Sequence, residues 1–104
     1  MKVFISQPMR DKTNEQIEAE RERALANLQK HYPKADIEVL DSFFKNAPHH
    51  AAPLWFLGKS FEILSRADVA YFVSGWKNYR GCKLEKLACD EYGIETITEQ
   101  EEEQ

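Results

Sequence analysis

A five-residue apolar run at positions 69–73 (VAYFV) is the feature that most constrains how this chain of 104 residues can fold. The run shows no alternation of polar and apolar residues, which is typical of a strand that is covered on both faces. Asp68 precedes it, a polar loop with two glycines (SGWKNYRG) follows it, and a helical pattern then continues to Gly93. A covered strand, a loop and a helix in this order form a unit of a parallel α/β sheet.

Further strands and helices are predicted on both sides of this unit. Thr13 with Gln16 three residues later has the form of a capping box, and Pro33 ends the helix that begins there at about Tyr32. Pro53 suits the first position of a second helix. The expected strands are residues 2–5, 37–40, 69–73 and 95–97, and the expected helices are residues 13–32, 53–64 and 79–92.

Strands that alternate with helices imply parallel strands, with helices on both faces of the sheet. We therefore expect an α/β fold, a single three-layer domain with a small parallel sheet of the Rossmann-like or flavodoxin-like kind, over residues 1–98. Residues 99–104 (EQEEEQ) have no apolar side chain to bury, so we expect a solvated acidic tail. A hydrophobic content of 42% over this length fits one domain and leaves no room for a second.

Helical spacing also predicts which side chains face the sheet. For the second predicted helix they are Leu54, Leu57, Phe61 and Leu64, and for the third they are Leu84, Leu87, Ala88 and Tyr92. Cys82 and Cys89 lie seven residues apart on the third helix. We expect them to be small core or interface residues with reduced thiols rather than redox groups.

Charge and hydropathy exclude several classes of protein. The net charge of −4 and the pI of about 5.4 argue against a partner that is a nucleic-acid polymer. No apolar run approaches the roughly 20 residues of a membrane span, and the start MKVFISQPM lacks the apolar core of a signal peptide. We expect a cytoplasmic protein with no membrane partner. A small sheet leaves aromatic side chains uncovered, which favours a homo-oligomer; these are Phe43, Phe44, Trp55 and Phe56.

The predicted loops are residues 6–12, 41–52 and 74–80. They should meet at one edge of the sheet, because each follows the carboxyl end of a parallel strand. Ligands in α/β folds bind at this edge. In the last loop, Gly75 and Gly81 permit a close backbone approach, and Asn78 could cap the following helix and turn its N–H groups toward an anion. Trp76 could stack on a base. The alternative is a solvated turn whose tryptophan packs on a neighbouring subunit.

The first loop, SQPMRDKT, also leads into a helix and supplies the other candidate ligand contacts. Ser6, Gln7 and Arg10 could bind a phosphate or a ribose there. The loop has no glycine and no GK[ST] signature, so it is not a Walker loop. A plain turn with a surface arginine is the alternative. The substrate-binding residues predicted from both loops are Ser6, Gln7, Pro8, Met9, Arg10, Gly75, Trp76, Asn78 and Gly81.

Glu85 is the candidate catalytic residue. It lies one to two turns into the third predicted helix, where the helix dipole favours an ionised carboxylate by about 0.3–1 kcal/mol. Such a carboxylate can attack a sugar anomeric carbon. The alternative is an exposed glutamate that pairs with Lys83 or Lys86. His49 and His50 lack a third ligand at metal-site spacing, so we expect no metal and no other cofactor.

The block ADVAYF…G…GCKLEKLACDEYGI resembles the "aDvv…sG…E…A…G" block of the nucleoside 2-deoxyribosyltransferases and the related deoxynucleoside 5′-monophosphate N-glycosidases. KVFISQPM resembles their opening strand and loop, and the similarity extends over nearly all of residues 2–97. The chain is most similar to small bacterial and phage members of unknown function. The resemblance implies that Glu85 cleaves an N-glycosidic bond through a covalent (deoxy)ribosyl intermediate, which passes to water or to a second base.

The sequence departs from this family at residues that orient the nucleophile or handle the proton of the leaving base. The tyrosine of the family's first strand falls on Val3 or Phe4, a helix carboxylate falls near Ser60, and the polar residue six before the nucleophile is Tyr79. These departures favour the alternative of a non-catalytic protein that binds a nucleotide or nucleotide-sugar in the same pocket. In both hypotheses the partner is a small-molecule nucleoside or nucleotide. A purely structural oligomer is a third possibility.

Overall fold

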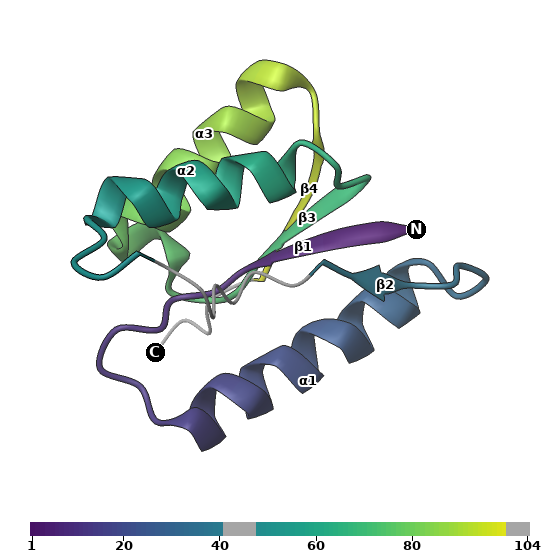
Figure 1. Cartoon of the computed structure of the whole chain (residues 1–104). Coiled ribbons are helices and arrows are strands. Elements are labelled where there is room, and N and C mark those ends of the chain that lie inside the picture. The colour runs from purple at the N-terminus through teal and green to yellow at the C-terminus, as the bar shows by residue number, and fades with distance from the viewer. Residues whose placement is uncertain (41–47, 100–104) are drawn as a thin grey trace.

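The computed structural model, which describes residues 1–40 and 48–99, is a four-stranded, all-parallel sheet with helices on both faces (Figure 1). The predicted α/β fold is therefore confirmed. The elements are β1 (Lys2–Ser6), α1 (Asn14–His31), β2 (Glu38–Val39), α2 (Pro53–Leu64), β3 (Val69–Phe72), the 3₁₀ turn η1 (Trp76–Asn78), α3 (Arg80–Tyr92) and β4 (Glu95–Thr98).

The strand order β2-β1-β3-β4 places β1 and β3 at the centre of the sheet. The two strands are in register from Val3 opposite Val69 to Ser6 opposite Phe72. Every residue of β3 is buried, as the unbroken apolar run predicts. Within the described residues, no helix combines the length and the apolar character that crossing a membrane requires.

Local signals in the sequence set the helix ends. Thr13 accepts a hydrogen bond from the Gln16 backbone N–H, and the Gln16 side chain accepts one from the Thr13 N–H, so the predicted capping box is present. Pro53 occupies the first turn of α2. Gly93 ends α3 in the left-handed region at φ 74°, where glycine meets no steric penalty.

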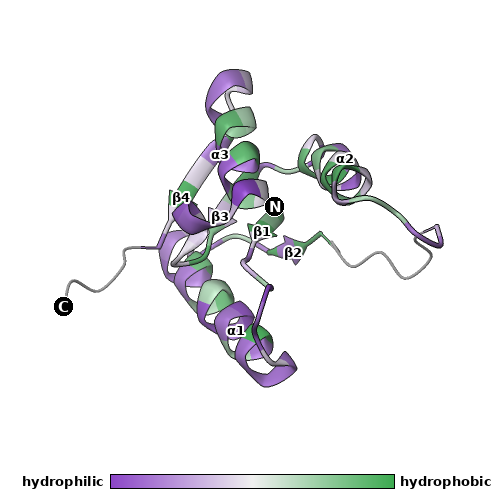
Figure 2. Cartoon of the chain, turned by 90° about the vertical axis from the view of Figure 1, so that its left-hand side faces the viewer, coloured by the Kyte–Doolittle hydropathy of each residue, from purple (hydrophilic) through white to green (hydrophobic). Residues whose placement is uncertain are grey.

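The three helices divide between the two faces of the sheet. On one face, α1 packs Ala24 and Leu28 against side chains that include Val3 and Tyr71. On the other face, α2 and α3 cover a second cluster, to which the two helices contribute Ile63, Leu64 and Cys89. Figures 1 and 2 show α1 on the side of the sheet opposite α2 and α3. Successive residues of the central strands therefore contact different helices.

The predicted inner faces of α2 and α3 are right in part: Leu64 of α2 is buried, and Ala88 of α3 packs against the same core cluster. The side of α3 that meets the sheet carries Cys82, Glu85 and Cys89, whereas Leu84, Leu87 and Tyr92 are exposed. In α2, the predicted Leu57 is half-buried, whereas the predicted Leu54 and Phe61 are exposed and Ile63, which was not predicted, is buried. In each helix, apolar residues recur at helical spacing on more than one side. Periodicity alone therefore could not show which side meets the sheet. Of the aromatics expected to be uncovered, Phe56 is exposed, Trp55 is half-buried, and Phe43 and Phe44 lie outside the described residues.

Candidate functional site

The candidate site lies where the two central strands end. The connection after β1 leads to α1 on one face, and the connection after β3 leads to α3 on the other. In open parallel sheets, the carboxyl edge at the point where the connections diverge to opposite faces is the usual position of ligands. The backbone N–H of Val73 donates to the carbonyl of Ser6 over 3.0 Å, so the two predicted loops begin side by side.

Glu85 projects from α3 toward the end of β1. The hydroxyl of Ser6 donates a hydrogen bond of 2.6 Å to Glu85 Oε1, and only 7% of the residue is exposed. Burial raises the pKa of the Glu85 carboxyl above its ordinary value, and hydrogen bonds from the hydroxyls of Ser6 and Ser60 oppose that rise. The alternative of an exposed glutamate paired with lysine is therefore wrong. The helix dipole was expected to favour the ionised carboxylate and so to lower its pKa. The pKa is raised instead, because burial is the largest of the effects on it.

Cys82 lies one turn before Glu85 on the same side of α3 and joins this contact. Burial raises the pKa of the Cys82 thiol to about 11, a hydrogen bond with Ser6 and the nearby charge of Lys12 lower it, and the charge of Glu85 raises it. The thiol is therefore neutral at physiological pH and serves as a small polar neighbour of the carboxyl. We call Ser6, Ser60, Cys82 and Glu85 the Glu85 cluster.

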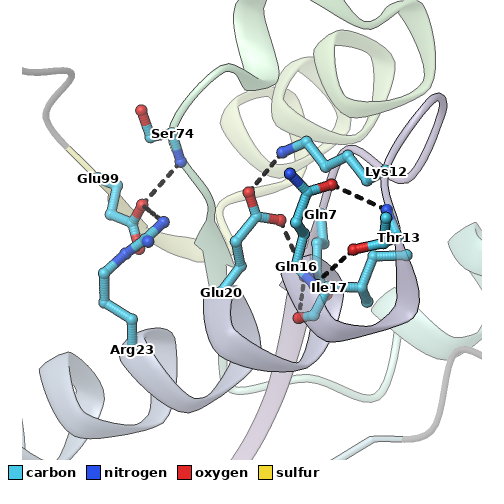
Figure 3. Close-up of polar contacts among 9 residues, drawn as sticks. All are labelled: Gln7, Lys12, Thr13, Gln16, Ile17, Glu20, Arg23, Ser74 and Glu99. Atoms are coloured by element: carbon cyan, nitrogen blue, oxygen red, sulfur yellow. Dashed lines mark hydrogen bonds and ion pairs between the residues drawn. The ribbon is translucent and has the colours of Figure 1, made fainter.

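The β1–α1 loop is fixed to α1 by polar contacts (Figure 3). Gln7 Nε2 donates to the Ile17 carbonyl over 2.7 Å and to Glu20 Oε1 over 3.2 Å, and Lys12 Nζ forms an ion pair of 2.5 Å with Glu20 Oε2. Gln7 is 8% exposed, and its buried Oε1 meets no hydrogen-bond donor in the part of the chain that the structure describes. Such an acceptor can receive a hydrogen bond from a ligand.

The other predicted residues of this loop separate into two groups. Pro8 is buried, whereas Met9 and Arg10 are exposed. A turn follows in which Asp11 has φ 62° and the Lys12 N–H donates to the Met9 carbonyl, so the Lys12 side chain returns to α1. Lys12 is thus the cation held near the Glu85 cluster. Arg10 was predicted to bind a phosphate or ribose, whereas the position of Lys12 was not predicted, because nothing in the local pattern reveals this turn.

The β3–α3 loop contains a position, residue 75, whose backbone conformation favours glycine. Gly75 has φ 93°, a conformation that side chains disfavour, and Trp76 follows at the start of η1. The indole packs on Phe72 with 5.5 Å between ring centroids, and Lys86 Nζ lies 6.0 Å from its centre. Trp76 is half-buried, so part of the ring remains accessible to a ligand.

Asn78 does not cap α3, contrary to the sequence analysis. The helix begins at Arg80, and its N-cap residue is Tyr79, which makes no side-chain capping bond. Asn78 instead ends η1 and is exposed. Gly81 is half-buried in the first turn of α3, and a Cβ added there meets no atom within 4 Å. The space beside Gly81 is therefore open in the described structure.

A second polar cluster, centred on Glu99, fixes the loop after β3 from the side of α1 (Figure 3). The Glu99 carboxylate accepts hydrogen bonds from the Arg23 guanidinium and the Ser74 backbone N–H, at 2.7 to 3.1 Å. It also accepts one of 2.7 Å from the Tyr71 hydroxyl, which the figure does not draw. Burial raises the pKa of Glu99, but these donors outweigh it and lower the pKa overall. Glu99 was predicted to lie in a solvated tail. The composition of residues 99–104 gave no sign of these contacts. Residues 100–104 lie outside the described structure.

The third predicted loop is described only from Pro48 onward, and residues 41–47 lie outside the described structure. His49 and His50 are exposed and pack against each other with 4.0 Å between ring centroids. No group of three or more potential metal ligands occurs within residues 1–40 and 48–99. Comparisons with protein-family models, with curated proteins and with solved structures gave no match to this chain.

Proposed function

We propose that the chain binds a nucleoside or nucleotide at the carboxyl edge of its sheet and cleaves the N-glycosidic bond with Glu85 as nucleophile. One observation carries this proposal: a buried carboxyl group faces the end of a central strand at the carboxyl edge of a parallel sheet. A buried carboxyl with a raised pKa in such a position is a common mark of a functional site. A structural role alone would not require an ionisable group there.

The proposed reaction is a double displacement at the anomeric carbon. In its ionised form Glu85 attacks that carbon, the bond to the base nitrogen breaks, and a (deoxy)ribosyl ester of Glu85 forms. Water or a second base then attacks the same carbon and releases the carboxylate. Ser6 holds Glu85 Oε1 through its hydroxyl, which fixes the direction of the side chain toward β1.

The surrounding loops supply groups that suit the rest of such a substrate. Gln7 Oε1 could accept a hydrogen bond from a sugar hydroxyl or a base amino group. Lys12 and the exposed Arg10 provide positive charge for a phosphate. The accessible part of Trp76 could stack on the base.

A second candidate function is binding without chemistry. Among the described residues, the groups that hydrogen-bond to Glu85 are the hydroxyls of Ser6 and Ser60, and the neighbouring Cys82 thiol has a pKa of about 11. None of these groups is a good acid at neutral pH, so the leaving base would take its proton from solvent or leave as an anion. This favours a protein that recognises a nucleotide or nucleotide-sugar without cleaving it.

Incubation with a panel of deoxynucleosides and their 5′-monophosphates, with base release followed by chromatography, distinguishes the two functions. We expect wild-type protein to release base from at least one member and Glu85→Ala to release none. Calorimetry with the same panel tests the alternative, which predicts binding without turnover. Base release that is equal in the wild type and Glu85→Ala would exclude Glu85 as the nucleophile.

A further inference from the structure

Two consecutive side chains at the end of β1 point to opposite faces of the sheet. Ser6 donates its hydroxyl to Glu85 of α3. Gln7 donates its amide N–H groups to two acceptors of α1, the Ile17 carbonyl and the Glu20 carboxylate (Figure 3). Successive residues of an extended chain alternate in this way. The end of β1 therefore has the carboxyl of Glu85 on one side and the amide of Gln7 on the other.

The contacts of Gln7 fix the orientation of its amide group. Nε2 lies 2.7 Å from the Ile17 carbonyl oxygen and 3.2 Å from Glu20 Oε1, so the reversed amide would place its oxygen against two acceptors. Oε1 is buried and meets no donor in residues 1–40 and 48–99. Because a buried acceptor without a donor is unfavourable, Oε1 is suited to a donor group of a bound molecule.

The chemistry proposed for Glu85 directs the base of the substrate toward Gln7. A nucleophile attacks the anomeric carbon from the side opposite the bond that breaks, so the base leaves away from α3 and toward α1. The two sides also lie close to each other. The charge of Lys12, in the loop before α1, lowers the pKa of the Cys82 thiol in the Glu85 cluster. A sugar bound at Glu85 would therefore present an edge of its base to Gln7.

We propose that Gln7 Oε1 accepts a hydrogen bond from the exocyclic amino group of adenine or cytosine, so that the site selects nucleosides and nucleotides of these two bases. This inference rests on the proposed function and names its substrate class. Adenine and cytosine carry an amino donor at the position where hypoxanthine, guanine, thymine and uracil carry a carbonyl oxygen. An amide oxygen accepts hydrogen bonds and cannot donate them.

A keto base would therefore leave Gln7 Oε1 buried and without a donor, and would bring two oxygens together. Trp76 does not compete for this edge, because stacking uses the face of a base. The amide of Gln7 thus determines specificity, and Glu85 performs the chemistry.

Calorimetry on Glu85→Gln tests the inference without depending on cleavage. One pair of probes is deoxyadenosine and deoxyinosine 5′-monophosphate, and the other is deoxycytidine and deoxyuridine 5′-monophosphate. Within each pair an amino group is replaced by a carbonyl group, with a hydrogen added on the neighbouring ring nitrogen. We expect the dissociation constant of the amino member to be at least about tenfold lower in at least one pair, because the keto member leaves an acceptor unpaired.

Gln7→Leu in the same background removes the acceptor with little change in size. We expect the ratio of the two dissociation constants to fall to about one. A merely structural role of Gln7 would weaken both members equally and leave the ratio unchanged. Gln29→Leu is the matched control, because Gln29 is an exposed glutamine of α1 whose amide donates to the carbonyls of Tyr32 and Pro33. It should keep the ratio of Glu85→Gln.

Equal dissociation constants within both pairs would overturn the inference, even if Gln7→Leu does not fold. Absence of binding by all four probes, or an unchanged ratio in folded Gln7→Leu, would overturn it as well. Base release by the wild type separates this inference from the proposed cleavage. Equal release from amino and keto substrates would contradict the selection and leave the cleavage standing. Selective binding of an amino member without release of base would support the selection and contradict the cleavage.

Discussion

The Glu85→Gln substitution is expected to lower kcat/KM for base release by at least about 1,000-fold, which corresponds to about 4 kcal/mol of transition-state stabilisation. Glutamine has nearly the same shape and can still accept a hydrogen bond from Ser6. It cannot form a glycosyl ester as a carboxylate does, so the loss should appear in kcat. The measurement is steady-state kinetics on the best substrate of the panel.

Glu91→Gln is the matched control, because Glu91 lies on the same helix and is exposed. We expect this variant to keep wild-type activity. The pH profile provides a further check. Burial raises the pKa of Glu85 above its ordinary value of 4.5, and attack requires the ionised form. The acidic limb of the wild-type kcat/KM profile should therefore lie above pH 4.5. A limb at or below pH 4.5 would contradict the role of Glu85.

The same variant should change the pH dependence of stability. Because the folded protein holds the Glu85 proton more tightly than the unfolded chain, this group stabilises the fold fully below pH 4.5. That contribution is lost as the pH rises through the raised pKa. Urea unfolding should thus show the wild type losing stability relative to Glu85→Gln over this window. A constant difference between the two proteins would contradict the raised pKa.

Glu99→Gln is expected to destabilise the fold by about 2 kcal/mol at neutral pH, because hydrogen bonds to a charged group contribute about 1.5–3 kcal/mol. The Glu99 carboxylate is 8% exposed and binds Arg23, Tyr71 and the Ser74 N–H. An amide can satisfy only some of these donors. The variant should also loosen the loop that leads to Trp76, since Ser74 begins that loop.

The contribution of Glu99 to stability depends on pH in the opposite direction to that of Glu85. The folded pKa of Glu99 is lowered, so its contribution is present above pH 4.5 and is lost as the pH falls through the folded pKa. The difference between the wild type and Glu99→Gln in urea unfolding should disappear in acid. Glu95→Gln is the control in β4, the strand just before Glu99, where the exposed Glu95 carboxylate accepts a hydrogen bond from the Tyr32 hydroxyl. We expect Glu95→Gln to change the free energy of unfolding by less than about 0.5 kcal/mol.

The order of strands and helices could be predicted because its signals are local. The unbroken apolar run of β3, the capping box at Thr13 and the glycine after α3 act within a few residues of each other. The parallel sheet then follows from the alternation of elements. Which side of α2 and of α3 faces the sheet could not be predicted from such local signals. The buried set of α3 includes a carboxyl and two thiols, whereas its leucines are exposed.

The candidate site could be predicted only in part, because its contacts join residues far apart in the sequence. Ser6 and Glu85 were both named, but their hydrogen bond spans 79 positions and no pattern reveals it. Lys12 and Glu99 were missed for the same reason. The ion pair of Lys12 depends on a turn at Asp11, and that of Glu99 depends on where β4 ends beside β3. Each is a consequence of the assembled fold.

Peptide mass spectrometry can detect the proposed covalent bond between Glu85 and the sugar. The protein is incubated with a 2-fluorinated nucleoside or its 5′-monophosphate, because the electron-withdrawing fluorine slows hydrolysis of a glycosyl ester. We expect one added sugar group on the peptide that contains Glu85, and none on the corresponding peptide of Glu85→Gln. Release of base by a wild-type protein whose Glu85 peptide stays unmodified would contradict it.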